Sequence, residues 1–65
     1  MNKISIIVPC YNEEKTILLV INEIKQYSVG DYEVIIVDDG STDDTKIILK
    51  SINQENIKII YHDQN

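Results

Sequence analysis

Two short polar segments carry most of the side chains in this sequence that could bind a ligand. They span residues 8–14 and 37–43, and each closes an apolar run and precedes a helical pattern. When strands run parallel, their carboxyl ends meet at one edge of the sheet, and open α/β sheets bind ligands in the crevice at that edge. We therefore expect the two segments to form one binding site.

The second segment contains two adjacent carboxylates, Asp38 and Asp39, followed by Gly40 and Ser41. Neighbouring carboxylates repel each other unless a hydrogen-bond donor or a cation offsets their charge. A ribose hydroxyl or a nucleobase N–H would supply the donor, and Mg²⁺ or Mn²⁺ would supply the cation if a phosphate brought the ion. Because Asp, Gly and Ser also dominate turns for local reasons, an ordinary turn before a capped helix is the alternative.

The first segment adds an aromatic ring and further polar groups. Tyr11 offers a flat ring on which a nucleobase could stack, or it packs against its own helix. Asn12 is placed to cap the following helix, and Glu13 to lie at the positive end of that helix. Cys10 has no neighbouring histidine, so we interpret it as a small buried residue rather than a nucleophile. His62 is interpreted as a surface residue at a strand end.

Composition and charge exclude several classes of protein. The net charge of −5 comes from six lysines and eleven acidic residues, so no basic stripe is present for nucleic acid or anionic lipid. The apolar runs are far shorter than the roughly 20 residues of a membrane-spanning helix, and we expect no membrane contact from this segment. Gly30 and Gly40 are too few for a dinucleotide-binding or P-loop motif. A single cysteine cannot form an internal disulfide, which favours a reducing, cytoplasmic setting.

The first half of the chain predicts a strand and a helix. Residues 4–8 form a β-branched apolar run that ends at Pro9, which cannot donate a ladder hydrogen bond. Residues 13–27 then have apolar side chains at three- and four-residue steps, with Asn12 as the expected cap. The predicted buried face of this helix consists of Ile17, Val20, Ile21, Ile24 and Tyr27.

The second half predicts strand, helix and strand. Residues 34–37 form a second apolar run after a turn at residues 28–31, and residues 57–61 form a third. Between these two runs, Ser41 and Asp44 fit a variant of the capping box. The predicted apolar face of the second helix consists of Thr45, Ile48, Leu49 and Ile52. The fold class is therefore α/β, a three-stranded parallel sheet in the order β-α-β-α-β.

The apolar strands leave one face of this sheet without a partner. Right-handed crossovers taken in one direction place both helices on the same face. Continuous apolar runs such as residues 34–37 are typical of strands that are buried on both faces. We expect the chain to be a truncated domain whose second face is covered by further sequence. The alternative is a complete small domain that self-associates through the uncovered face.

Residues 6–14 read IIVPCYNEE and residues 34–43 read VIIVDDGSTD. Together, and in this order, these two motifs resemble the inverting family 2 glycosyltransferases of the GT-A fold, the group that includes dolichyl-phosphate mannose synthases. The resemblance covers residues 1–65 and implies the Rossmann-like, nucleotide-sugar-binding N-terminal half of a glycosyltransferase domain. The implied reaction transfers a sugar from a UDP- or GDP-sugar to a hydroxyl or a lipid phosphate.

By this resemblance, a nucleotide-sugar site is expected where the two motifs meet. Pro9 and Tyr11 would line the base pocket, and Glu13 would help to hold the nucleotide. Asp38 and Asp39 would contact the base or the ribose. The complete expected set is Pro9, Tyr11, Asn12, Glu13, Asp38, Asp39, Gly40 and Ser41.

In the family, the metal motif and the catalytic base belong to later parts of the domain. An Asp-x-Asp-type motif holds Mn²⁺ or Mg²⁺ on the donor diphosphate, and a further carboxylate acts as general base. Neither is present here, and Asp38-Asp39 must not be taken for the metal motif because it ends the second strand. We therefore expect no catalytic residue and no metal ligand in this chain, and no sugar transfer by the chain alone.

Two other classes of function compete with this interpretation. A receiver-type signalling module also binds Mg²⁺ with an acidic pair at a strand end, but that pair follows its first strand, whereas Asp38-Asp39 follows the second. A non-catalytic assembly module would use the uncovered sheet face as its working surface.

Overall fold

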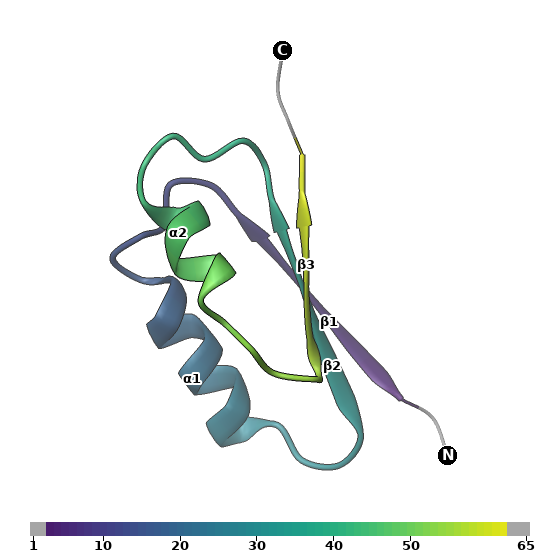
Figure 1. The fold of residues 1–65 in the computed structure, drawn as a ribbon. Helices are drawn as coiled ribbons and strands as arrows, with labels where there is room; N and C mark the ends of the chain where they lie inside the picture. Colours follow the sequence, from purple (N-terminus) through teal and green to yellow (C-terminus); the bar gives the residue numbers. More distant parts are fainter. Residues whose placement is uncertain (1–2, 63–65) are drawn as a thin grey trace.

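The computed structural model describes residues 3–62, which form a parallel sheet with two helices against it (Figure 1). The elements in chain order are β1 (Ile4–Cys10), α1 (Ile17–Tyr27), β2 (Tyr32–Asp38), α2 (Thr45–Lys50) and β3 (Ile57–Tyr61). The spatial order of the strands is β1-β2-β3, and both pairings are parallel. The predicted α/β class and the β-α-β-α-β order are confirmed.

Two of the strands are longer than the apolar runs that predicted them. β1 continues through Pro9 to Cys10, because Pro9 lies on an edge strand opposite Val37, where a missing N–H is tolerated. β2 begins at Tyr32 and ends at Asp38, so its last residue is a carboxylate. β3 has the predicted bounds.

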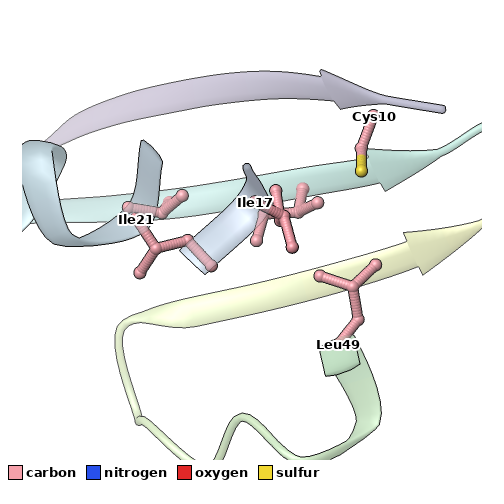
Figure 2. Packing of buried hydrophobic residues seen from close by; sticks show 6 residues of the cluster. Cys10, Ile17, Ile21 and Leu49 are labelled. Carbon is pink, nitrogen blue, oxygen red and sulfur yellow. The ribbon is translucent and has the colours of Figure 1, made fainter. Parts of the chain in front are cut away.

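One hydrophobic core lies between the sheet and the two helices. Alternate strand residues point to opposite faces, and the even-numbered residues of β1 and β2 face α1 and α2. The buried apolar side chains are Cys10, Ile17, Ile21, Val34, Ile36 and Leu49 (Figure 2). Both helices pack on this single face of the sheet, as expected from the right-handed crossovers (Figure 1).

The start of the first helix was predicted too early. α1 begins at Ile17, its first turn has no acidic residue, and no side chain caps it. Asn12 is therefore not its cap, and residues 13–16 form a turn in which the amides of Thr16 and Ile17 donate to the carbonyl of Glu13 at 3.0 and 2.8 Å.

The predicted buried faces of the two helices agree with the structure to different degrees. In α1, Ile17 and Ile21 are buried, but Val20 is 38% exposed and Tyr27 is 76% exposed, so the apolar face is narrower than predicted. In α2, Thr45 and Leu49 are buried, as predicted. The predicted capping box is wrong, because Asp44 is the N-cap residue and makes no capping hydrogen bond with its side chain.

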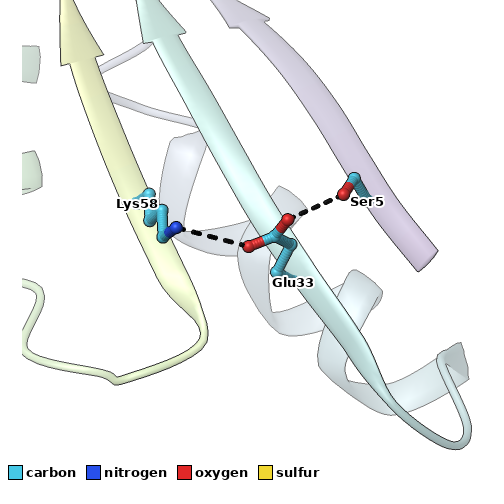
Figure 3. A network of polar contacts seen from close by, with 3 residues as sticks. All are labelled: Ser5, Glu33 and Lys58. Carbon is cyan, nitrogen blue, oxygen red and sulfur yellow. Dashed lines mark hydrogen bonds and ion pairs between the residues drawn. The ribbon is translucent and has the colours of Figure 1, made fainter. Parts of the chain in front are cut away.

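The other face of the sheet has no cover among residues 3–62. Ile7 and Ile60 on this face are 58% and 46% exposed. A polar band crosses its amino-terminal end: Ser5 Oγ donates to Glu33 Oε1 at 2.8 Å, and Lys58 Nζ lies 3.7 Å from Glu33 Oε2 (Figure 3). We call this surface the open face, defined by Ser5, Ile7, Pro9, Glu33, Ile35, Val37, Lys58 and Ile60.

Candidate functional site

The carboxyl ends of the three strands meet at one edge of the sheet, where all eight predicted site residues lie. Cys10 pairs with Asp38, and Asp38 pairs with Tyr61. Beyond the ladder, the amide of Asp39 donates to the carbonyl of Cys10 at 2.9 Å, and the amide of His62 donates to the carbonyl of Asp38 at 2.7 Å. The predicted meeting of the two polar segments is therefore observed.

The carboxamide of Asn12 bonds to the β2–α2 loop rather than to its own helix. Its Oδ1 accepts from the amides of Thr42 and Asp43 at 2.8 and 3.3 Å, and its Nδ2 lies 3.4 Å from Thr42 Oγ1. The backbone of Asn12 has φ 52°, in the left-handed region that asparagine tolerates better than most residues. The Asn12 side chain therefore binds the backbone of the β2–α2 loop instead of capping α1.

The buried Ser41 hydroxyl accepts one hydrogen bond from the first loop and donates another to a carboxylate, an arrangement that we call a relay. The amide of Asn12 donates to Ser41 Oγ at 2.9 Å, and the Ser41 hydroxyl donates to Asp38 Oδ1. Ser41 is 6% exposed and Asp38 is fully buried. A backbone amide of the first loop is thus held by a hydroxyl whose own proton goes to a carboxylate.

A second relay of the same form lies one residue further along the first loop. The amide of Glu13 donates to Thr45 Oγ1 at 2.9 Å, and the Thr45 hydroxyl donates to Asp43 Oδ1. Asp43 Oδ1 also accepts from the amide of Thr45 at 2.9 Å. Thr45 is fully buried at the start of α2.

The predicted site residues therefore divide into exposed and buried groups. The exposed members are Pro9, Tyr11, Asn12, Glu13 and Asp39, whereas Asp38 and Ser41 are buried and Gly40 is half-buried. The Tyr11 side chain is 54% exposed. Glu13 Oε2 accepts from the Thr16 hydroxyl at 2.6 Å. Gly40 has φ 81°, a turn conformation that glycine adopts without steric cost.

The electrostatics of the edge follow from this burial. Burial, and then the charges of Asp38, Glu13 and Asp43, raise the pKa of the Cys10 thiol to about 11. At neutral pH the thiol is therefore protonated, which agrees with a packing role. For Asp43, burial alone would raise the pKa, but hydrogen bonds from the Thr45 hydroxyl and amide outweigh it and lower the pKa. Burial, and then the charge of Asp38, raise the pKa of Tyr61.

The two carboxylates of the acidic pair lie in different environments. Asp38 is buried with Oδ1 bonded to Ser41, while Asp39 is exposed. Within residues 3–62, no group of three His, Cys, Asp or Glu side chains could hold a metal ion. The burial of Asp38 also argues against a receiver-type module, whose acidic pair must reach Mg²⁺.

The described residues enclose no pocket. Asp38 Oδ2 is buried and has no hydrogen-bond partner among these residues. No helix in residues 3–62 is long and apolar enough to cross a membrane.

Sequence reasoning missed three residues of this edge, Thr42, Asp43 and Thr45. Thr45 was predicted only as part of an apolar helix face, and Thr42 and Asp43 only as parts of a motif. A signal for them was present, since residues 41–45 are all Ser, Thr or Asp, which is more hydroxyl and carboxylate than one helix cap needs. Their partners, Asn12 and Glu13, lie in the other loop, at sequence separations of 30 to 32 residues.

A parallel β-α-β-α-β sheet with two linked polar loops at its carboxyl edge has the arrangement of the nucleotide-binding halves of α/β proteins. Residues 5–65 match the model of glycosyl transferase family 2. The chain belongs to that family, which confirms the resemblance. No solved structure matches it significantly.

Several characterised proteins are similar to this chain. It is 41% identical over 68 residues to the teichoic acid poly(glycerol phosphate) polymerase of Staphylococcus epidermidis, covering 100% of this chain and 9% of that protein. It is 34% identical over 61 residues to the GalNAc(5)-diNAcBac-PP-undecaprenol beta-1,3-glucosyltransferase of Campylobacter jejuni, covering 94% and 20%. It is 37% identical over 62 residues to the dolichyl-phosphate beta-glucosyltransferase of Saccharomyces cerevisiae, covering 89% and 19%. The chain thus spans a fifth or less of the length of these three relatives.

Proposed function

We propose that this chain holds the nucleotide of a UDP- or GDP-sugar in an inverting glycosyltransferase that passes the sugar to a hydroxyl or a lipid phosphate. The observation that carries the proposal is the joining of the two motif loops by hydrogen bonds at one sheet edge, where Tyr11 and Asp39 are exposed. Membership of the family and the lipid-linked acceptors in the names of two relatives support it.

The exposed residues have the chemistry that a nucleotide requires. The Tyr11 ring stacks on the base, with Pro9 beside it at the end of β1. The Asp39 carboxylate accepts a hydrogen bond from a base N–H or a ribose hydroxyl, and Asn12 and Glu13 complete the rim on the same side. Gly40 lets the backbone of the second loop approach the nucleotide closely.

Within residues 3–62, no group of three His, Cys, Asp or Glu side chains could hold a metal ion. In our proposal, Mn²⁺ or Mg²⁺ on the donor diphosphate is held by ligands other than Asp38 and Asp39, and the general base is supplied from elsewhere in the enzyme. The chain alone then binds nucleotide and transfers no sugar. We place the reaction in the cytoplasm or on the cytoplasmic face of a membrane.

We further propose that the open face associates with a second copy when nothing else covers it. Its apolar part, Ile7, Ile35, Val37 and Ile60, is continuous across the three strands by register. Burial of such a patch is favourable at roughly 25 cal/mol per Å² of apolar surface.

An amide NMR titration with UDP and with GDP, with and without Mg²⁺, tests the nucleotide site. We expect shifts confined to residues 10–13 and 38–41, and the nucleotide that shifts them at the lower concentration identifies the base of the donor. Tyr11→Ala should weaken binding, whereas Tyr27→Ala, an exposed tyrosine at the far end of α1, should not. A well-dispersed spectrum that neither nucleotide perturbs would contradict the proposal.

A further inference from the structure

Two hydroxyl groups connect the loops of the site, and both are shielded from solvent. Ser41 Oγ and Thr45 Oγ1 each accept a backbone amide of the first loop, from Asn12 and Glu13 respectively, at 2.9 Å. Ser41 is 6% exposed and Thr45 is fully buried. A nucleotide on the open surface of this edge would therefore meet the first loop and not these hydroxyls.

Each hydroxyl is oriented by a carboxylate. A hydroxyl has one proton to donate, and here that proton goes to Asp38 Oδ1 or Asp43 Oδ1. Because the hydroxyl proton is donated to the carboxylate, a lone pair of the hydroxyl oxygen is left to accept the hydrogen bond from the amide of the first loop. Hydrogen bonds to an ionised acceptor are about twice as strong as neutral ones, so the orientation is firm.

The bonds are more than local helix capping. The Thr45 amide bonds to Asp43 two residues away, which is a local cap, but the Thr45 hydroxyl reaches the Glu13 amide 32 residues away. Asn12 bonds back from the first loop to the amides of Thr42 and Asp43. The two loops are thus tied in both directions and must move together.

We propose that Ser41 and Thr45, oriented by Asp38 and Asp43, are positioning residues that fix the backbone of residues 11–13 for nucleotide binding without touching the nucleotide. This inference rests on the proposed function. It assigns to Asp38 and Ser41 a supporting role in place of the direct contact expected from the sequence, and it adds Asp43 and Thr45 to the site. The ligand contact then falls to the exposed side chains of Tyr11 and Asp39.

Substitutions at Thr45 separate the hydroxyl from the shape of the side chain. Thr45→Val keeps the shape and loses the hydroxyl, whereas Thr45→Ser keeps the hydroxyl and loses a methyl group. In the free chain, Thr45→Val should speed hydrogen exchange of the Glu13 amide about tenfold and shift the amide signals of residues 11–13. Thr45→Ser should return both the exchange rate of the Glu13 amide and the amide signals of residues 11–13 toward those of the wild type.

Nucleotide affinity then distinguishes positioning from contact. We expect Thr45→Val to raise the Kd for the preferred nucleotide about tenfold and Thr45→Ser to recover most of that loss. Asp39→Asn should also raise the Kd, but the Glu13 amide should exchange as in the wild type. If Thr45→Val does not fold, Asp43→Ala at a half-buried position removes the orienting acceptor and takes its place in the test.

The outcomes separate the two proposals. If the wild type binds and Thr45→Val binds equally well, or leaves the exchange of the Glu13 amide unchanged, the positioning role is wrong and the proposed function stands. If Thr45→Ser loses as much affinity as Thr45→Val, packing rather than the hydroxyl is responsible, which also overturns the positioning role. If the wild type binds neither nucleotide, the proposed function fails, and the positioning role fails with it.

Discussion

Replacing Ser41 by alanine should cost this small domain a large part of its stability. The change removes one hydroxyl that serves two groups, the amide of Asn12 and Oδ1 of the buried Asp38. Loss of a hydrogen bond to a buried charged group costs about 1.5–3 kcal/mol, and the amide adds up to about 1 kcal/mol because water reaches it only in part. We therefore expect the free energy of unfolding to fall by about 2–4 kcal/mol.

That loss is large against the stability of the chain. At roughly 0.05–0.15 kcal/mol per residue, a domain of this length has about 3–10 kcal/mol in total. The carboxylate has no second protein partner to fall back on, since Asp38 Oδ2 is already unpaired among residues 3–62. If the stability of the wild type lies at the lower end of that range, Ser41→Ala should be partly unfolded in the absence of ligand.

Urea denaturation followed by far-UV circular dichroism at neutral pH measures the effect. Ser51→Ala is the matched control, because the Ser51 hydroxyl also donates a hydrogen bond, to the carbonyl of Ile48 at 2.6 Å, but is exposed. The control should change the free energy of unfolding by no more than about 0.5 kcal/mol. If Ser41→Ala were as mild as Ser51→Ala, the relay through Ser41 would contribute nothing to the fold and our account of this edge would be refuted.

Three further predictions concern other parts of the molecule. Because the Cys10 pKa is raised to about 11, a thiol reagent at neutral pH should label the chain slowly, and urea should accelerate labelling in proportion to the unfolded fraction. The Ser5 hydroxyl, and then Lys58, lower the pKa of Glu33, so its contribution to stability is present at neutral pH and is lost as pH falls below its ordinary value of 4.5. The free energy of unfolding of Glu33→Gln should accordingly fall less steeply with decreasing pH in the acid range than that of the wild type. An unchanged pH dependence would contradict this role of Glu33. Finally, Ile60→Asp on the open face should weaken self-association in sedimentation, while Ile47→Asp should not, because Ile47 is an exposed isoleucine of α2 outside the open face. A monomeric wild type would contradict the proposed association.

The elements could be predicted from the sequence because each depends on a local pattern. Continuous β-branched runs gave three strands, and β3 has its predicted bounds. Of the residues predicted for the inner face of the second helix, Thr45 and Leu49 are buried and Ile48 is half-buried, while the half-buried Ile52 lies beyond the last residue of α2. Helix α1 was predicted to begin four residues too early, since Asn12 and Glu13 look like a cap and a first turn. Their amides and the Asn12 carboxamide instead bond to a loop far away in the sequence, which no local rule could anticipate.

The meeting of the two polar loops could also be predicted, but the division of their residues into exposed and buried could not. Adjacent carboxylates such as Asp38 and Asp39 look equivalent in a turn, and only the length of β2 distinguishes them. Once β2 is seen to continue past Val37, side-chain alternation places Asp38 on the same face as Val34 and Ile36, beneath the helices. A buried carboxylate requires a donor, and the nearest hydroxyl along the chain is Ser41. The same alternation leaves Asp39 outside the sheet and exposed, so the geometry of one strand end separates a buried carboxylate, which is bonded to Ser41, from an exposed one.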